Sequence, residues 1–260
     1  MITSTQNPRI KNILKLDKAR ERREQNLFVI EGGREISLAI AGGYTFHSLY
    51  VCDELLSIEG RSLVKKLPVP AESISRTVFE KIAYRGQSDG IIAIAIPKQL
   101  QLSGIRLSEK PFIIVLEAVE KPGNLGAILR TADAARTDAV IVCDPQTDIY
   151  NPNTIRSSIG CVFTQQVITC TSEEALQWMK QSGIRVHAAE LTASEWYHQA
   201  DFTQPSAIVM GTEAEGLTGF WLDHADNRIK IPMRGRIDSL NVSVSTAIMT
   251  FEAMRQRDFK

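Results

Sequence analysis

The segment IPMRGRIDSLNVSVSTAIMTFEAMR, residues 231–255, is the part of the sequence that best predicts the fold. Pro232 ends the ladder pairing of a short apolar strand, and a polar run leads from there to Asn241. Beyond Asn241 the spacing predicts an amphipathic helix, because apolar residues recur at steps of three and four: Val244, Ala247, Ile248, Phe251 and Met254. Either Ser239 or Asn241 can cap its first amides. Such strand–loop–helix units often build ligand sites, although an ordinary structural unit has the same pattern.

The composition favours a protein with one large or two modest hydrophobic cores. The chain has 260 residues, of which 43% are hydrophobic, and its thirty basic and thirty acidic side chains give a formal net charge of zero. This length is sufficient to bury a proper core. The zero net charge provides no general attraction to nucleic acid, so any basic binding surface has to be local.

The cysteines and the apolar runs argue against disulfides, metal centres and membrane spans. The four cysteines show no C-x-x-C spacing and lie mostly in apolar runs, so we expect reduced thiols in a cytoplasmic protein and no metal site. No apolar run approaches eighteen residues and no N-terminal signal peptide is visible. We therefore expect no association with a membrane.

The order of strand and helix patterns predicts two α/β domains. Residues 1–97 alternate short strands with helices, and residues 98–110 form a polar linker. Residues 111–260 then repeat the alternation in a larger domain. Its apolar runs are flanked by helices, which indicates a mostly parallel sheet covered on both faces. Its predicted strands are Phe112–Leu116, Ala139–Val142, Val167–Thr169, Arg185–Ala189 and Ala207–Met210.

The N-terminal helix carries an excess of positive charge. Asn7 is a good helix cap and Pro8 suits the first helical position. The first 26 residues contain three acidic and seven basic side chains. The basic residues are Arg9, Lys11, Lys15, Lys18, Arg20, Arg22 and Arg23. These residues form either a solvated helix face with internal ion pairs or a surface that contacts phosphates.

Two further stretches of the second domain have the features of ligand-binding loops. In Asn124–Ala132, Gly126 permits a close backbone approach where a strand passes into a helix, and Arg130 lies further along that helix. In Gly211–Leu217, two glycines five residues apart follow a strand, so the loop amides can face a ligand. This loop is neither a P-loop nor a dinucleotide-binding fingerprint.

Taken together, the three stretches resemble the SpoU family, also called TrmH, of RNA ribose methyltransferases in the SPOUT superfamily. The resemblance covers about residues 111–260, and residues 1–97 look like the small substrate-binding domain of many members. One departure is Arg136-Thr137, where many members have an aromatic residue or alanine followed by glycine. The matching residues are Asn124, Gly126, Arg130, Gly211, Glu213, Gly216, Pro232, Ser239, Leu240, Asn241 and Ser243.

The resemblance implies an α/β-knot fold, in which the C-terminal segment of a mostly parallel sheet is threaded through a loop as a trefoil knot. It also implies that the knot binds S-adenosyl-L-methionine in a bent pose and that two protomers complete each site. The expected cofactor-binding residues are Leu191, Gly211, Gly216, Ile231 and Leu240. The C-terminal helix and the helix after Asn124 would contribute to the homodimer.

The resemblance further implies that Arg130 is catalytic, and family proposals make this arginine the base that deprotonates the ribose hydroxyl. A guanidinium is a poor base, so Arg130 would alternatively bind the adjoining phosphate and stabilise the developing alkoxide. The other expected catalytic residues would hydrogen-bond one another, the ribose or the knot loops: Asn124, Glu213, Ser239 and Asn241. Their alternative role is to cap and shape these loops.

These expectations define an enzyme that methylates the ribose 2′-hydroxyl of structured RNA, with ribosomal RNA favoured over transfer RNA. Two alternatives stay open. One is a SPOUT enzyme that methylates a base nitrogen, and the other is a catalytically silent RNA-binding protein of the same fold.

Overall fold

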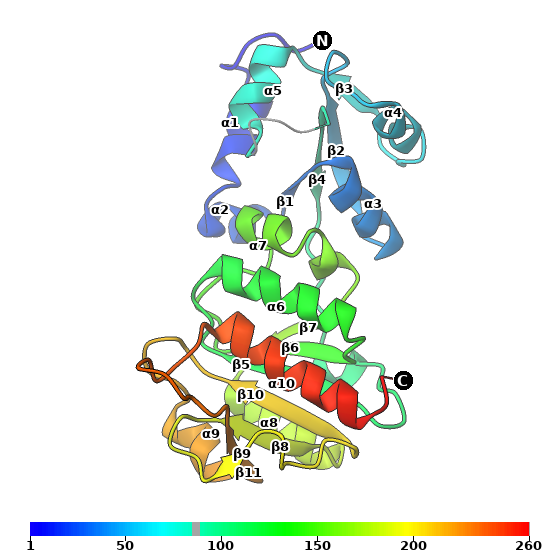
Figure 1. The fold of residues 1–260 in the computed structure, drawn as a ribbon. Coiled ribbons are helices and arrows are strands. Elements are labelled where there is room, and N and C mark those ends of the chain that lie inside the picture. Colours follow the sequence, from blue (N-terminus) through cyan, green and yellow to red (C-terminus); the bar gives the residue numbers. More distant parts are fainter. Residues whose placement is uncertain (85–88, 260) are drawn as a thin grey trace. The chain divides into compact units, whose positions relative to one another are not determined.

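The computed structural model describes residues 1–84 and 89–259, which divide into two compact units. The first unit contains residues 1–98 and 148–164, and the second contains residues 99–147 and 165–260 (Figure 1). Residues 148–164 thus belong to the first unit and not, as their place in the sequence predicts, to the second. Residues 99–110, which are predicted as a linker, belong to the second unit.

The first unit is a four-stranded sheet with helices packed against it. The strands have the order β1-β4-β2-β3, in which only β2 and β3 pair in parallel among the described residues. The elements are α1 (Pro8–Lys15), α2 (Ala19–Gln25), β1 (Phe28–Glu31), α3 (Gly33–Ala41), β2 (Phe46–Val51), α4 (Ile58–Val64), β3 (Ala71–Ser73), α5 (Arg76–Ile82), β4 (Ile91–Ala95), α7 (Pro152–Ser157) and the 3-10 helix η2 (Cys161–Phe163).

The predicted N-terminal helix is confirmed, and its inner face forms part of the core. The Asn7 side chain accepts a hydrogen bond from the Arg9 amide at 2.9 Å, and Pro8 is the first helical residue. Helices α1 and α5 together cover one face of the sheet. The buried members of this cluster are Ile10, Ile13, Leu16, Tyr50, Cys52, Ile74, Val78, Phe79, Ile82, Ile92 and Ile94.

Arg22, one of the seven basic residues of this region, has a structural role. Its side chain is only 3% exposed, and its Nε donates to Asp148 Oδ2 at 2.6 Å. Its Nη1 donates to the carbonyl oxygens of Leu16 and Asp17 at 2.7 and 2.9 Å. A buried charge of this kind has to be paired, so Arg22 is unable to contact RNA. The sequence left two roles open for the seven basic residues, a solvated helix face or a phosphate-contacting surface, and the burial of Arg22 excludes both for this residue.

Aromatic packing explains why residues 148–164 belong to the first unit. The Tyr150 ring stacks on Phe28 with centroids 4.3 Å apart, and Phe163 lies 6.0 Å from the same ring. The Tyr44 ring contacts Tyr150 and Phe163 edge-on, with ring centroids 6.1 and 5.1 Å apart, respectively. Large apolar rings of this kind contribute strongly to core stability. The segment therefore completes a core that residues 1–98 leave incomplete.

The second unit is a seven-stranded parallel sheet, which confirms the predicted sheet type. Its strand order is β7-β6-β5-β10-β8-β11-β9, and all the pairings of described residues in it are parallel. The elements are the 3-10 helix η1 (Leu102–Gly104), β5 (Phe112–Glu117), α6 (Pro122–Ala134), β6 (Ala139–Cys143), β7 (Val167–Cys170), α8 (Ser172–Gln181), β8 (Arg185–Ala189), β9 (Glu195–Trp196), β10 (Ser206–Met210), α9 (Gly219–His224), β11 (Asn227–Lys230) and α10 (Val242–Gln256).

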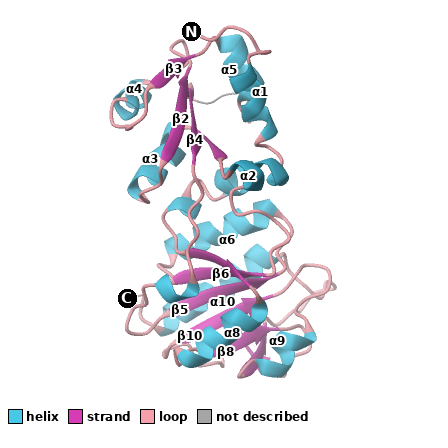
Figure 2. Cartoon of the chain, turned by 180° about the vertical axis from the view of Figure 1, so that it is seen from behind, coloured by secondary structure: helices cyan, strands magenta, loops and turns pink. Residues whose placement is uncertain are grey.

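Helices cover both faces of this sheet, so its central strands are apolar along their whole length. Strands β5, β6 and β10 are buried at every residue. Helices α8 and α9 pack on one face through a cluster that includes Met179 and Trp221, and they lie in front in Figure 2. Helices α6 and α10 lie side by side on the opposite face, in front in Figure 1.

The loops that follow parallel strands gather at one edge of the sheet. β5, β8, β10 and β11 are neighbours, and the chain leaves each of them at its carboxyl end. Open α/β sheets bind ligands outside this edge. In the described part of the chain, none of the helices has the length and apolar content that crossing a bilayer requires.

A buried histidine in β8 should make the stability of the protein depend on pH. Within the described residues neither ring nitrogen of His187 has a hydrogen-bond partner, and burial lowers its pKa from 6.5 to about 4. The unfolded chain therefore binds an extra proton between these values. We expect the free energy of unfolding to fall by up to about 3 kcal/mol from pH 6.5 to pH 4 through this residue.

Denaturant unfolding between pH 4 and pH 7 tests this expectation against His187→Leu, which lacks the titrating group. The wild type should lose stability relative to this variant as the pH falls. The exposed His198→Leu change serves as the control and should follow the wild type. Parallel curves for wild type and His187→Leu would contradict the assignment.

Candidate active site

A cavity of about 520 Å³ lies at the carboxyl edge of the second unit's sheet. The loops after β8, β10 and β11 and the first turns of α10 form its wall. Its lining residues are Ala189–Thr192, Met210–Leu217, Leu222, Ile229–Ile231, Met233, Asp238–Leu240, Val242, Ser245 and Met249. The five residues expected to bind the cofactor, Leu191, Gly211, Gly216, Ile231 and Leu240, all line this cavity.

The loop after β10 is a tight turn that requires glycine at its first position. The Thr212 amide donates to the Gly216 carbonyl at 3.0 Å, and the Gly216 amide donates back to Thr212 at 3.1 Å. A Cβ atom on Gly211 would lie 2.1 Å from the carbonyl carbon of Gly216, which is closer than any real contact. Gly216 itself has a φ of +73°, a conformation that favours glycine.

A buried carboxylate holds the far end of this loop. Glu117, at the end of β5, is 4% exposed and accepts hydrogen bonds from the Thr218 amide at 2.8 Å and the Thr218 hydroxyl at 2.6 Å. The loop is therefore fixed by its own backbone at one end and by β5 at the other. We did not identify Glu117 from the sequence, because an acidic residue at a strand end is common at surfaces.

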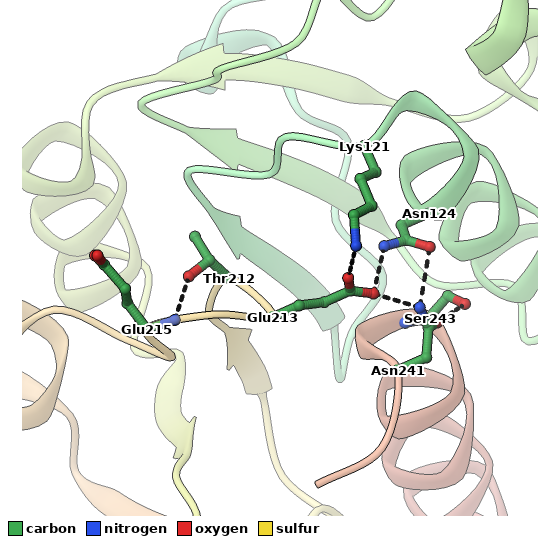
Figure 3. Close-up of polar contacts among 7 residues, drawn as sticks. All are labelled: Lys121, Asn124, Thr212, Glu213, Glu215, Asn241 and Ser243. Carbon is green, nitrogen blue, oxygen red and sulfur yellow. Dashed lines mark hydrogen bonds and ion pairs between the residues drawn. The ribbon is translucent and has the colours of Figure 1, made fainter.

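Glu213, in the cavity wall, connects the loop after β10 to the N-termini of two helices (Figure 3). Its Oε1 accepts hydrogen bonds from Asn124 Nδ2 at 2.8 Å and from Asn241 Nδ2, and its Oε2 contacts the Lys121 ammonium. Asn241 Nδ2 also lies 3.2 Å from Asn124 Oδ1. The carboxylate thereby joins the N-terminus of α6, the loop after β10 and the N-terminus of α10. We call Lys121, Asn124, Glu213 and Asn241 the Glu213 cluster.

Asn241 has a second role as the N-cap of α10, which confirms one of the two predicted caps. Its Oδ1 accepts from the Ser243 amide at 3.0 Å and from the Ser243 hydroxyl at 2.6 Å. Both ends of the amide are thus occupied, one by the helix and one by Glu213. The start of α10 is consequently held at a defined place beside the cavity.

The electrostatics of the Glu213 cluster favour an ionised carboxylate. The hydrogen bond from Lys121, followed by that from Asn124, lowers the pKa of Glu213 below its ordinary value of 4.5. Because both oxygens are occupied and the pKa is low, the carboxylate is a poor proton acceptor and a good anchor for its neighbours.

Among the described residues, two of the expected catalytic residues make no hydrogen bond or ion pair with the Glu213 cluster. The Ser239 hydroxyl donates to Asp238 Oδ1 at 3.0 Å, and Ser239 lines the cavity. Arg130 is exposed on α6, between one and two turns after Asn124. Among the described residues, Arg130 makes no hydrogen bond or ion pair with the Glu213 cluster.

Lys121 is a functional candidate that the sequence did not reveal. It precedes Pro122, the first residue of α6, and its only visible signal is its position three residues before Asn124. The described residues include no group of three or more histidine, cysteine, aspartate or glutamate side chains that is suitable for a metal ion.

Replacing Lys121 by methionine should impair the site through Glu213. We expect kcat to fall by about tenfold, because the lost charge-assisted hydrogen bond loosens the carboxylate that positions Asn124 and Asn241. The pKa of Glu213 should rise, so the acid limb of the pH–rate profile should move to higher pH. Lys121→Arg should retain most of the activity. An unchanged pH profile in Lys121→Met would contradict this role.

Comparison with known proteins relates both units to RNA methyltransferases. Residues 111–251 match the model of the SpoU rRNA Methylase family, and residues 7–93 match the MRM3-like substrate binding domain. The Bacillus subtilis protein RlmP, a 23S rRNA (guanosine(2553)-2'-O)-methyltransferase, is 27% identical over 256 residues, which cover 96% of this chain and 97% of RlmP.

Two solved structures are similar over nearly the whole chain. A crystal structure of an RNA 2'-O ribose methyltransferase is 40% identical, has a TM-score of 0.87 and is matched over 98% of both chains. The SpoU methyltransferase AviRb from Streptomyces viridochromogenes, in complex with AdoMet, is 26% identical and has a TM-score of 0.91. That match covers 97% of this chain and 99% of AviRb.

Proposed function

Because this chain belongs to the SpoU rRNA Methylase family, it transfers a methyl group from S-adenosylmethionine to a ribose 2′-hydroxyl of RNA, and we propose that its substrate is ribosomal RNA. The observation that supports this function best is the position of the Glu213 cluster at the rim of the 520 Å³ cavity. The cavity is large enough for a cofactor, and we propose that the ribose binds beside the cluster.

We propose that Leu191, Gly211, Gly216, Ile231 and Leu240 hold the cofactor. The cavity is within the size range of small-molecule sites, about 300–1,000 Å³, and its wall combines apolar side chains with loop backbone. Leu191 is 57% exposed, so a bound ligand would cover apolar surface that otherwise faces water. S-adenosylmethionine supplies a methyl group that is already activated on a sulfonium.

The protein has to place the hydroxyl in line with that methyl group and assist the loss of its proton. Positioning of this kind supplies on the order of 7–11 kcal/mol in favourable cases. We propose that Asn124, Glu213, Ser239 and Asn241 shape the ribose side of the site. We further propose that Arg130 binds the adjoining phosphate and stabilises the developing alkoxide, since a guanidinium holds its proton too tightly to be a good base.

We propose that the protein is a homodimer joined through α6 and α10. The apolar stripe predicted on α10 faces largely outward: Val244 is 47% and Phe251 43% exposed, and Ala247 and Ile248 are half-buried between them. Arg130 is exposed on the neighbouring helix α6. A partner packed on this stripe would cover it and bring an Arg130 toward a site on the other protomer.

The Phe251→Arg variant should be monomeric. A charge in the centre of an apolar interface has to be desolvated without a partner, which disfavours association. Light scattering after size-exclusion chromatography would measure the mass of the variant and of a control, Ile58→Arg, in which an isoleucine that is 83% exposed on the first unit is changed. A dimeric Phe251→Arg protein would place the interface elsewhere.

Methylation of total RNA with a labelled methyl donor tests the substrate. We expect label in ribosomal RNA, and we expect the linkage after the labelled nucleotide to resist alkali, because the 2′-oxygen is blocked. Cleavage at the labelled nucleotide would indicate a base methyltransferase. No transfer to any RNA, together with no cofactor binding by calorimetry, would indicate a silent RNA-binding protein.

The threading of the C-terminal segment as a knot stays a prediction.

A further inference from the structure

The loop between β11 and α10 presents a basic tip beside the cavity. Met233 lines the cavity on one side of this tip, and Asp238, Ser239 and Leu240 line it on the other. Arg234 and Arg236, between them, are exposed and do not line the cavity. The flanks of the loop therefore belong to the cofactor site, while its tip faces solvent.

The two guanidinium groups differ from the other basic groups around the cavity. Lys121 contacts Glu213, Arg228 lies 3.6 Å from Asp223 Oδ1 and 3.9 Å from Glu190 Oε2, and the Lys230 ammonium lies 5.4 Å from the centroid of Trp196. Within the described residues, Arg234 and Arg236 have no hydrogen-bonded or ion-paired side chain.

The nearest acidic side chain in the sequence leaves the two arginines available. Asp238 Oδ1 accepts a hydrogen bond from the Ser239 hydroxyl at 3.0 Å, and Asp238 itself belongs to the cavity wall. Residues 234–238 thus keep a net charge of +1, from two arginines and one aspartate. On a protein of zero formal net charge, this tip is a local positive site.

The chemistry of the substrate matches this tip. A ribose within an RNA strand carries a phosphodiester on each side, so a 2′-hydroxyl brought to the cavity brings two negative charges with it. Arginine binds phosphate oxygens with two parallel N–H donors and fixes the register of a strand without reading its sequence.

We propose that Arg234 and Arg236 bind the phosphates that flank the methylated nucleotide and thereby hold the RNA strand over the cofactor cavity. This inference rests on the proposed function and adds a substrate-positioning element to it. The two arginines contact RNA and not the cofactor, because their side chains lie outside the cavity wall.

The double variant Arg234→Gln/Arg236→Gln tests this proposal. We expect KM for RNA to rise on the order of tenfold to a hundredfold, as for the loss of two charge-assisted contacts. Cofactor affinity and kcat at saturating RNA should remain those of the wild type. The affinity for RNA in the absence of cofactor should fall by a similar factor. For single-stranded RNA, the slope of log K against log salt concentration should become shallower by roughly 0.7 for each lost phosphate contact.

A matched control removes two positive charges elsewhere on the second unit. Arg106→Gln/Lys110→Gln changes two exposed residues that precede β5 and lie outside the cavity wall. Equal RNA affinity and salt dependence in both double variants would overturn the proposal. A loss of cofactor affinity in Arg234→Gln/Arg236→Gln would also overturn it, since the tip would then act by shaping the cavity. A wild type that binds RNA through this tip without methylating it would refute the proposed function alone.

Discussion

Arg130→Ala is expected to lower methyl transfer by at least about a hundredfold to a thousandfold, the usual effect of removing a group that stabilises developing charge. Cofactor affinity should hardly change, because Arg130 does not line the cavity. Single-turnover kinetics with labelled cofactor would measure the first effect, and calorimetry the second. Arg136→Ala, an exposed arginine just beyond the same helix, is the matched control. Substantial activity in Arg130→Ala would refute the assignment.

Two further measurements distinguish the possible roles of Arg130. Lys in its place keeps the charge but loses the bidentate geometry, so Arg130→Lys should recover only part of the rate if a phosphate is the partner. If Arg130 were the proton acceptor, its replacement would instead have to remove a limb from the pH–rate profile. We expect the pH–rate profiles of the wild type and of Arg130→Lys to have the same limbs.

Gly211→Ala is expected to abolish cofactor binding, with a loss of affinity of at least about a hundredfold. The added Cβ would collide with backbone atoms of Gly216 and Leu217 at 2.1–2.4 Å, and backbone is unable to give way as a flexible side chain does. The pair of hydrogen bonds between Thr212 and Gly216 would have to open. The cavity wall made by residues 211–217 would then change shape.

Calorimetric titration with S-adenosylmethionine would measure this loss. Gly219→Ala is the matched control, because an added Cβ at that glycine would meet no atom within 4 Å. Thermal unfolding of both variants would show whether the fold survives. Normal cofactor affinity in Gly211→Ala would mean that the loop is softer than its contacts indicate.

The two inactive variants together test whether each site is shared between protomers. In a mixed dimer, the intact cavity of an Arg130→Ala protomer would meet the intact arginine of a Gly211→Ala protomer. After random exchange, we expect about a quarter of the sites to regain activity, as two-fold symmetry dictates. Two inactive proteins that stay inactive after mixing would place Arg130 in its own protomer's site.

The sheet of the second unit was predictable because burial on both faces leaves a clear pattern. The predicted strands Phe112–Leu116 and Ala207–Met210 correspond to β5 and β10. Each observed strand is longer than the predicted one by a single residue. These strands are apolar throughout because helices cover them on both sides. Periodicity likewise predicted α10, which begins after Asn241 as expected.

The side of α10 that enters the core was not predictable from the spacing. Met254 is buried, but the other buried residues of the helix, Thr246, Met249, Thr250 and Ala253, lie on a face that includes two threonines. The Thr246 hydroxyl donates to the Val242 carbonyl at 2.7 Å, which satisfies it without a partner outside the helix. Hydrophobicity alone therefore points to the outward stripe.

The Glu213 cluster was predictable in part, and the limit is physical. Asn124, Glu213 and Asn241 each lie in one of the three recognisable motifs, and the structure brings their side chains together. Lys121 and Glu117 contribute contacts that depend on how separate loops meet in space. No local pattern around either residue indicates its partner. The burial of Arg22 likewise depends on Asp148, 126 residues away.

The excursion of residues 148–164 has a consequence for dissecting the molecule. The polypeptide passes from one unit to the other three times, near residues 98, 147 and 164. A single cleavage between the units is therefore unable to release two self-sufficient halves. A fragment that starts at residue 99 would contain Tyr150 and Phe163 without Phe28, on which both stack. Their rings would be exposed to solvent and would favour aggregation. Any exchange of the first unit between relatives would have to transplant residues 1–98 and 148–164 together.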